Sequence, residues 1–160
     1  MDIREPEANI VELMAKVEEM MEKHYQACAE RFIAQKDFWN NVAQEEANHK
    51  QCLRDLYGKV KDNLVFLDEK RFNKTSIKEF HKHLQNMLQA IQLESASMKE
   101  ALQNSIQMET LLLEKNFFEI FKTDSEDIKR TINRIVEDTK NHRLRMEEVL
   151  TSLSASPSGC

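Results

Sequence analysis

The scarcity of glycine and proline constrains this chain more than any other feature of its sequence. Only two of each occur in 160 residues, so the chain has few of the residues that tight turns between strands require. Charged residues make up 32% of the sequence and apolar residues 41%. This mixture, in a chain of a size suited to a single core, is typical of an all-α bundle.

Apolar residues recur at helical spacing in two long stretches of the first half. The first stretch extends from Pro6, a favoured residue near a helix start, to Phe32. A tight connection at residues 34–37 follows, and Asp37 is the expected N-cap of a second helix whose apolar face extends to Val60. These two stretches predict a helical hairpin.

The second half begins with residues 61–73, over which the helical pattern is lost. A capping box at residues 76–79 opens a short helix, and another at residues 97–100 opens a third long helix that the apolar pattern extends through Ile120. A turn and cap at residues 123–126 begin the last helix. The last two helices therefore form a second predicted hairpin.

The link between the two hairpins is too long for an up-and-down bundle. Such a bundle needs a short connection between its second and third long helices, whereas this chain has about 35 residues there. We predict one all-α domain over residues 1–153, a four-helix bundle of two hairpins joined by a long crossover that contains a short extra helix. Residues 154–160, which are rich in serine, are predicted to form a disordered tail.

Both halves of the chain carry the same pattern of metal-ligand residues. The first half contains Glu18, then Glu46 and His49, and the second half contains Glu109, then Thr139 and His142, at nearly the same offsets. A repeated Glu…Glu-x-x-His unit is the means by which helical bundles surround two metal ions with carboxylates and imidazoles. In the second unit a threonine replaces the glutamate of Glu-x-x-His.

These residues lie on the apolar faces of their predicted helices, as Glu18 does between Met14 and Met21. Several carboxylates buried in one layer require a cation or shared protons. Carboxylate oxygens combined with imidazole suit iron or manganese, and zinc is also compatible. We therefore predict one or two iron ions bound by Glu18, Glu46, His49, Glu109 and His142. The alternative is a buried polar layer without metal.

Other polar residues fit this layer less well. Glu22, one turn from Glu18, is either an additional ligand or a solvated residue, and Tyr25 is placed to hydrogen-bond a carboxylate. The remaining histidines are His24, which is off the Glu18 face, and His81 and His83, which are predicted at the surface. The eight methionines are predicted as core filler.

Composition also excludes several classes of protein. The formal net charge of -5 and the lack of a basic run argue against nucleic acid binding. No apolar stretch approaches the roughly 20 residues that span a bilayer, and the N-terminus lacks the apolar segment of a signal peptide, so we expect a cytoplasmic protein without membrane contact. The three cysteines form no C-x-x-C pair, which excludes a rubredoxin-type or zinc-ribbon module. Cys28 and Cys52 are predicted as small buried residues.

The motifs resemble the rubrerythrin-like branch of the ferritin-like superfamily. The matching residues are Ala15-x-x-Glu18 with Tyr25, Ala43-x-Glu45-Glu46-x-x-His49, Ile106-x-x-Glu109 and Asp138-Thr139-x-x-His142. The resemblance implies a ferritin-like fold and a di-iron site that reacts with peroxide or oxygen. It implies that Glu18 and Glu109 are terminal ligands, that Glu46 bridges, and that His49 and His142 each bind one metal. Because the sequence contains no rubredoxin module, it also implies an external electron donor.

Thr139 departs from this pattern, because it stands where the resemblance implies a second bridging carboxylate. A hydroxyl is a weak ligand for iron, and Asp138 or Glu137 would have to reach the metals from a neighbouring face. Two functions remain open. One is a rubrerythrin-like di-iron oxidoreductase. The other is a non-enzymatic bundle with a decayed site, a structural or partner-binding protein in which Thr139 donates a hydrogen bond to a neighbouring carboxylate.

A third function, a haemerythrin-like oxygen carrier, is set aside because only His49 and His142 are inward among the histidines it would need. We expect the protein to be a homodimer.

Overall fold

The computed structural model describes residues 5–68, 74–114 and 118–155. This part of the chain contains five α-helices, one 3₁₀ turn and two very short strands, so the predicted all-α class is confirmed. The elements are α1 (Glu5–Arg31), η1 (Ile33–Gln35), α2 (Lys36–Lys61), β1 (Phe66–Leu67), α3 (Lys74–Gln92), α4 (Met98–Glu114), β2 (Phe121–Lys122) and α5 (Glu126–Ala155).

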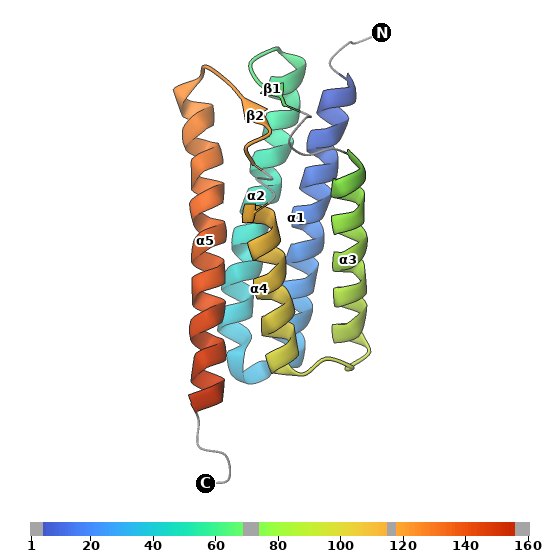
Figure 1. Cartoon of the computed structure of the whole chain (residues 1–160), viewed down its shortest axis with the longest axis vertical. Helices are drawn as coiled ribbons and strands as arrows, with labels where there is room; N and C mark the ends of the chain where they lie inside the picture. The colour runs from blue at the N-terminus through green and yellow to red at the C-terminus, as the bar shows by residue number, and fades with distance from the viewer. Residues whose placement is uncertain (1–4, 69–73, 115–117, 156–160) are drawn as a thin grey trace.

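The helices run alternately up and down along the long axis of the molecule (Figure 1). Helices α1 and α2 pack together as an antiparallel hairpin, and α4 and α5 form a second one. Helix α3 lies in the connection between the hairpins and packs mainly on α1. The order of elements is therefore the predicted one, with a helix-containing crossover between two hairpins.

Side-chain caps fix two helix starts as the sequence predicts. The Ser97 hydroxyl accepts a hydrogen bond from the Glu100 backbone N–H at 3.1 Å, which is one of the two bonds of a capping box, and it donates to the Glu100 carboxylate at 3.3 Å. The Ser125 hydroxyl accepts from the Ile128 N–H at 3.3 Å and so caps α5 within the predicted turn.

Two other predicted caps are wrong. Helix α2 begins directly after η1, with Gln35 at the N-cap position, and this places Asp37 inside the first helical turn. The acidic side chain there still interacts favourably with the positive end of the helix dipole. The chain is already helical at Lys74, so Ser76 is also within a helix and does not cap it.

The third long helix is shorter than predicted. The described part of α4 ends at Glu114, and residues 118–120, over which the apolar pattern continued the helix, form a turn that is followed by β2. Strand β2 pairs antiparallel with β1, with Phe66 opposite Lys122. This pairing, together with a hydrogen bond from the Asp68 N–H to the Ile120 carbonyl at 2.7 Å, gives backbone partners to the segment after α2. A contact so distant in sequence cannot be read from local periodicity.

Helix α5 extends through residue 155, two residues beyond the predicted end of the domain at residue 153. The rest of the predicted tail, residues 156–160, lies outside the described residues.

Large apolar side chains fill the space between the helices. Buried methionines are among them, as predicted, with Met14, Met21, Met108 and Met146 at most 1% exposed. Cys28 is buried, whereas Cys52 is only half-buried. None of the helices in the described ranges has the length and apolar character to cross a membrane.

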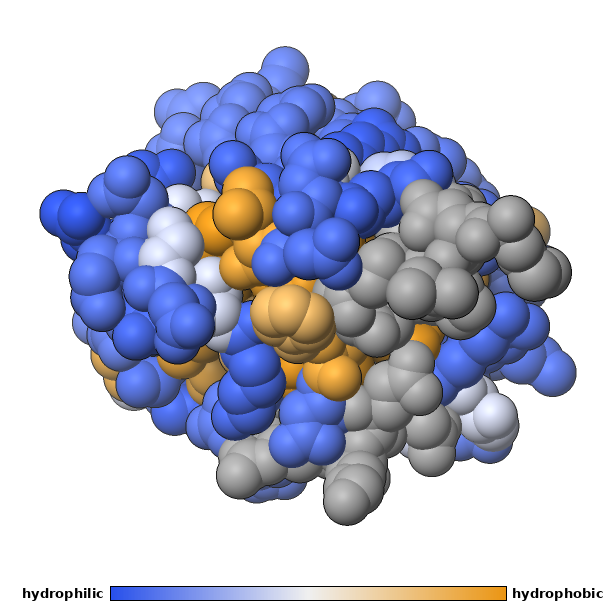
Figure 2. Space-filling view, turned by 90° about the horizontal axis from the view of Figure 1, so that it is seen from above, coloured by the Kyte–Doolittle hydropathy of each residue, from blue (hydrophilic) through white to orange (hydrophobic). Residues whose placement is uncertain are grey.

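Apolar residues reach the surface at the end of the molecule that carries the strands. Figure 2, viewed onto that end, shows apolar side chains at the surface with polar ones beside them. Leu64, just before β1, and Phe66, within β1, are each about half exposed.

Candidate metal centre

All five predicted ligands lie together in the interior, where four helices meet. Glu18 comes from α1, Glu46 and His49 from α2, Glu109 from α4 and His142 from α5, and none is more than 2% exposed. Thr139, one turn before His142 on α5, is equally buried. Each reaches the interior because it occupies the apolar stripe of its own helix.

The five residues form two groups that share Glu46. One group is Glu18, Glu46 and His49, the other is Glu46, Glu109 and His142, and in each the ligand atoms lie within 4.8 Å of one another. The Glu46 Oε2 atom is 3.3 Å from His49 Nδ1, and its Oε1 atom is 3.0 Å from His142 Nδ1. Glu46 thus presents one oxygen to each group, and each group could hold a metal ion.

The ligand atoms of these groups lack hydrogen-bond partners among the described residues. Seven such atoms are buried, namely both carboxylate oxygens of Glu18 and of Glu46, Oε2 of Glu109, and Nδ1 of His49 and of His142. The contacts of His49 Nδ1 and His142 Nδ1 with Glu46, at 3.3 and 3.0 Å, are ion pairs when the imidazoles are protonated, but they do not meet hydrogen-bond geometry. Buried polar atoms without partners are costly, and a cation would satisfy them together.

Two carboxylates outside the ligand groups contact the Nε2 atoms of the imidazoles. The Asp138 carboxylate lies 3.1 Å from His49 Nε2, and the Glu45 carboxylate contacts His142 Nε2 and also Arg145 at 2.5 Å. A proton on each Nε2 leaves each Nδ1 with a lone pair that faces the interior, which is the form that binds metal.

Each of these carboxylates belongs to the helix opposite the imidazole that it contacts, and this pairing was not predicted from the sequence. The sequence places Asp138 on a neighbouring face, from which it would have to reach the metals, and it gives Glu45 only as part of the matching motif. The available signal was their position, because each immediately precedes the first residue of an i, i+3 pair, Glu46–His49 or Thr139–His142.

The hydrogen bond predicted for Tyr25 is present. Its hydroxyl donates to Glu109 Oε1 at 2.6 Å, and its ring stacks on Trp39 with centroids 5.7 Å apart. Tyr25 is fully buried, so its hydroxyl fixes the orientation of the Glu109 carboxylate.

Thr139 does not act as the sequence suggested for a site without metal. Its hydroxyl donates to the Ile135 carbonyl of its own helix at 2.8 Å, and among the described residues no hydrogen bond joins it to a carboxylate. The predicted donation to a neighbouring carboxylate is therefore wrong. The physical reason is that a threonine side chain on a helix readily reaches the carbonyl one turn before it.

Glu22, Glu137, His81 and His83 lie outside the two ligand groups. Glu22 pairs with Lys50 at 2.6 Å and is not a ligand in either group, and Glu137 pairs with Lys140 at the surface. His83 is exposed and His81 is half-exposed.

Burial and proximity shift the pKa values of the central carboxyls in opposite directions. Burial and the neighbouring Glu46 carboxylate raise the pKa of Glu18 well above its ordinary value. Burial alone would also raise the pKa of Glu46, but contacts with Glu18, His142 and His49 lower it well below its ordinary value. The two directions are opposite because the carboxyls are adjacent and Glu46 is the one in contact with both imidazoles.

The imidazoles carry the balancing positive charge. Burial opposes protonation of His142, but its contacts with Glu109, Glu45 and Glu46 raise its pKa to about 12. Contacts with Glu46 and Asp138 likewise raise the pKa of His49 against the effect of burial. Protons thus compensate the buried carboxylates, and a metal ion would bind by displacing them.

A second buried polar group was missed from the sequence. His24 was placed off the Glu18 face, yet it is only 2% exposed, and its Nε2 lies 3.1 Å from the Ser105 hydroxyl on α4 and 3.8 Å from the Cys28 sulfur. Burial lowers the pKa of His24 to about 4 and raises that of Cys28 to about 12. A neutral imidazole beside a protonated thiol makes this a packing group and not a nucleophilic site.

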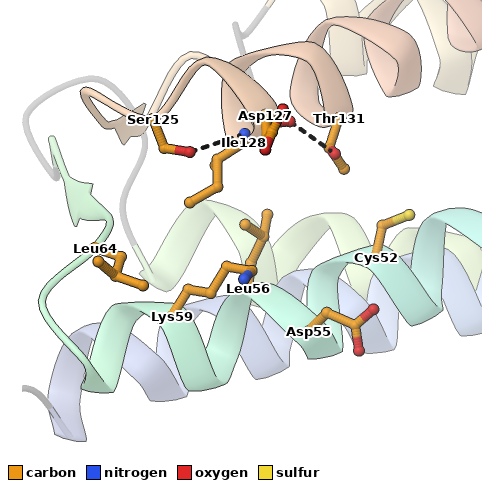
Figure 3. Close-up of a pocket in the computed structure, with 9 residues that line it drawn as sticks. All are labelled: Cys52, Asp55, Leu56, Lys59, Leu64, Ser125, Asp127, Ile128 and Thr131. Atoms are coloured by element: carbon orange, nitrogen blue, oxygen red, sulfur yellow. Dashed lines mark hydrogen bonds between the residues drawn. The ribbon is translucent and has the colours of Figure 1, made fainter.

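A surface pocket of about 320 Å³ lies away from the carboxylates, between the later turns of α2 and the start of α5 (Figure 3). Cys52, Asp55 and Lys59 line it from α2, and none of the five predicted ligands does. Burial raises the pKa of the Cys52 thiol, so the pocket offers no activated nucleophile. The carboxylate–imidazole cluster is therefore the better candidate for chemistry.

Comparisons with protein-family models, curated proteins and solved structures each found no match for this chain.

Proposed function

We propose that this protein binds two divalent metal ions in its carboxylate–imidazole cluster and that it is a rubrerythrin-like di-iron protein with a ferritin-like bundle. The observation that carries the proposal is the set of seven buried ligand atoms, all in one layer, that have no hydrogen-bond partner among the described residues. Oxygen and imidazole donors suit iron first, with manganese or zinc as substitutes.

The residues divide evenly between two ions. Glu18 and His49 would hold one ion, Glu109 and His142 the other, and Glu46 would bridge them with one oxygen each. Two ferrous ions at such a site would supply the two electrons that reduction of hydrogen peroxide to water requires.

The surrounding residues would tune that chemistry. Asp138 and Glu45 hold the imidazole rings with Nδ1 inward, and Tyr25 orients Glu109. The burial of all five ligands limits access to small molecules, which favours peroxide or oxygen over a bulky substrate. An electron donor outside the chain is part of the proposal.

The ferritin-like part of the proposal is supported by the arrangement of the helices. Two antiparallel hairpins are joined by a long crossover, and ligands from all four of their helices point to the same layer.

The competing function, a scaffold with a decayed site, is favoured by Thr139 alone. It requires a polar layer whose members satisfy one another. The Glu18 and Glu46 oxygens have imidazole contacts but accept no hydrogen bond among the described residues, and Thr139 bonds to Ile135 and not to a carboxylate. Both observations weigh against a fully hydrogen-bonded layer.

Elemental analysis tests the proposal most directly. The protein is expressed in iron-supplemented medium without a metal-affinity tag, and we expect two irons per chain. Glu46→Ala and His49→Ala together should abolish binding, whereas Glu22→Gln, one turn from Glu18 on α1, should leave it intact. No metal in the wild-type protein, even after anaerobic reconstitution with ferrous iron, would refute the proposal.

A further inference from the structure

The internal duplication leaves one position of the metal centre without its counterpart. Glu45, Glu46 and His49 on α2 recur in order and spacing as Asp138, Thr139 and His142 on α5. Two of the three pairs act equivalently, since Glu45 and Asp138 each contact the imidazole of the opposite helix, and both imidazoles turn Nδ1 inward. Only the Glu46–Thr139 pair differs.

Thr139 cannot take the bridging role that Glu46 has. A threonine side chain ends before the position that a glutamate carboxylate would reach, and the hydroxyl of Thr139 is directed to the Ile135 carbonyl. The ligand set within the described residues therefore provides a carboxylate bridge from the α2 side and none from the α5 side.

The charge balance shows what is missing. The three central carboxylates carry three negative charges against the four positive charges of two divalent ions, and the imidazoles are neutral when they bind metal. Within the ligand layer itself, one positive charge would remain unbalanced, because the outer carboxylates Asp138 and Glu45 lie on the far side of the imidazoles and Glu45 is shared with Arg145. An anion inside this buried layer would balance that charge more closely than Asp138 does.

We propose that a small monocarboxylate, of the class of formate and acetate, binds on the Thr139 side as an exogenous bridging ligand. This inference rests on the proposed metal centre. A carboxylate supplies the two oxygens and the single negative charge that Glu46 supplies from the other side. Its source is solution, and the outer carboxylates Glu45 and Asp138 line a surface pocket of about 340 Å³, so the centre lies one imidazole away from solvent.

Calorimetric titration with Co²⁺ in chloride buffer, with and without millimolar sodium formate, tests this directly. Formate should tighten Co²⁺ binding to the wild-type protein, by about tenfold when its concentration is about ten times its own dissociation constant. Sodium chloride at equal ionic strength controls for screening.

Two variants locate the effect. Thr139→Glu supplies the bridge from the chain, so it should bind Co²⁺ more tightly without formate and lose the response to formate. Thr139→Val keeps the volume without the hydroxyl and should respond as the wild type does, because the hydroxyl is bonded to Ile135.

The outcomes separate this inference from the function on which it rests. Co²⁺ binding that formate does not change in the wild type overturns the inference and leaves the metal centre standing. An equal response in Thr139→Glu also overturns it, because the anion would then bind elsewhere. Failure of every variant to bind Co²⁺ or ferrous iron overturns the metal centre and the inference together.

Discussion

Replacing Tyr25 by phenylalanine removes one buried hydrogen bond and leaves the surrounding packing intact. The hydroxyl donates to Glu109 at 2.6 Å, while the ring, which phenylalanine retains, stacks on Trp39. Both Tyr25 and Glu109 have no measurable exposure, so water cannot replace the lost donor. A buried hydrogen bond to a carboxyl group contributes about 1 to 3 kcal/mol, the larger value applying when the acceptor is ionised.

Urea unfolding of the metal-free protein should therefore show a loss of about 1 to 3 kcal/mol for Tyr25→Phe. In thermal melts this corresponds to a decrease in Tm of roughly 2 to 4 °C for each kcal/mol in a chain of this size. The same substitution in a Glu109→Ala background should cost much less, because the acceptor is gone, and the difference isolates the pair.

The metal-loaded protein gives a second readout. If Glu109 is a ligand whose orientation Tyr25 fixes, Tyr25→Phe should weaken Co²⁺ binding by roughly 10- to 100-fold. A change in unfolding free energy below about 0.5 kcal/mol, equal in both backgrounds, would refute the hydrogen-bond reasoning.

Three further predictions concern His24, the outer carboxylates and the cap of α4. Burial lowers the pKa of His24 to about 4 from 6.5, so the unfolded chain binds more protons between these values. The stability contribution of His24 is then complete above pH 6.5 and falls by about 3 kcal/mol towards pH 4, and urea unfolding across this range should show a shallower acid loss in His24→Gln. Asp138→Asn and Glu45→Gln should each weaken Co²⁺ binding by about 10- to 100-fold, whereas Glu137→Gln, a control on the exposed face of α5, should not; equal affinities in a calorimetric titration would contradict the outer-carboxylate role. Ser97→Ala removes the cap of α4 and should lower the unfolding free energy by about 1 kcal/mol, with no change in metal affinity.

The helices and the inward positions of the ligands could be predicted from the sequence because both depend on local spacing. A residue such as Glu18, in the middle of an apolar stripe, must turn inward wherever that stripe is buried. The i, i+3 spacing likewise places Glu46 and His49 on one face whatever the neighbouring helix is. The repeated motif then indicated that the two hairpins contribute to a common layer.

Contacts between the hairpins could not be predicted in this way. The pairings of His49 with Asp138 and of His142 with Glu45 join residues about ninety positions apart, and they depend on the rotation and axial offset of α2 against α5. The burial of His24 against Ser105 depends on how closely α1 approaches α4. The β1–β2 pairing likewise required two connections to meet at one end of the bundle.

The sequence by itself thus determined which side chains face inward, because a helix carries its own periodicity. The tertiary structure alone decided which of them meet and which atoms they leave without partners, because those distances depend on how rigid helices pack against one another.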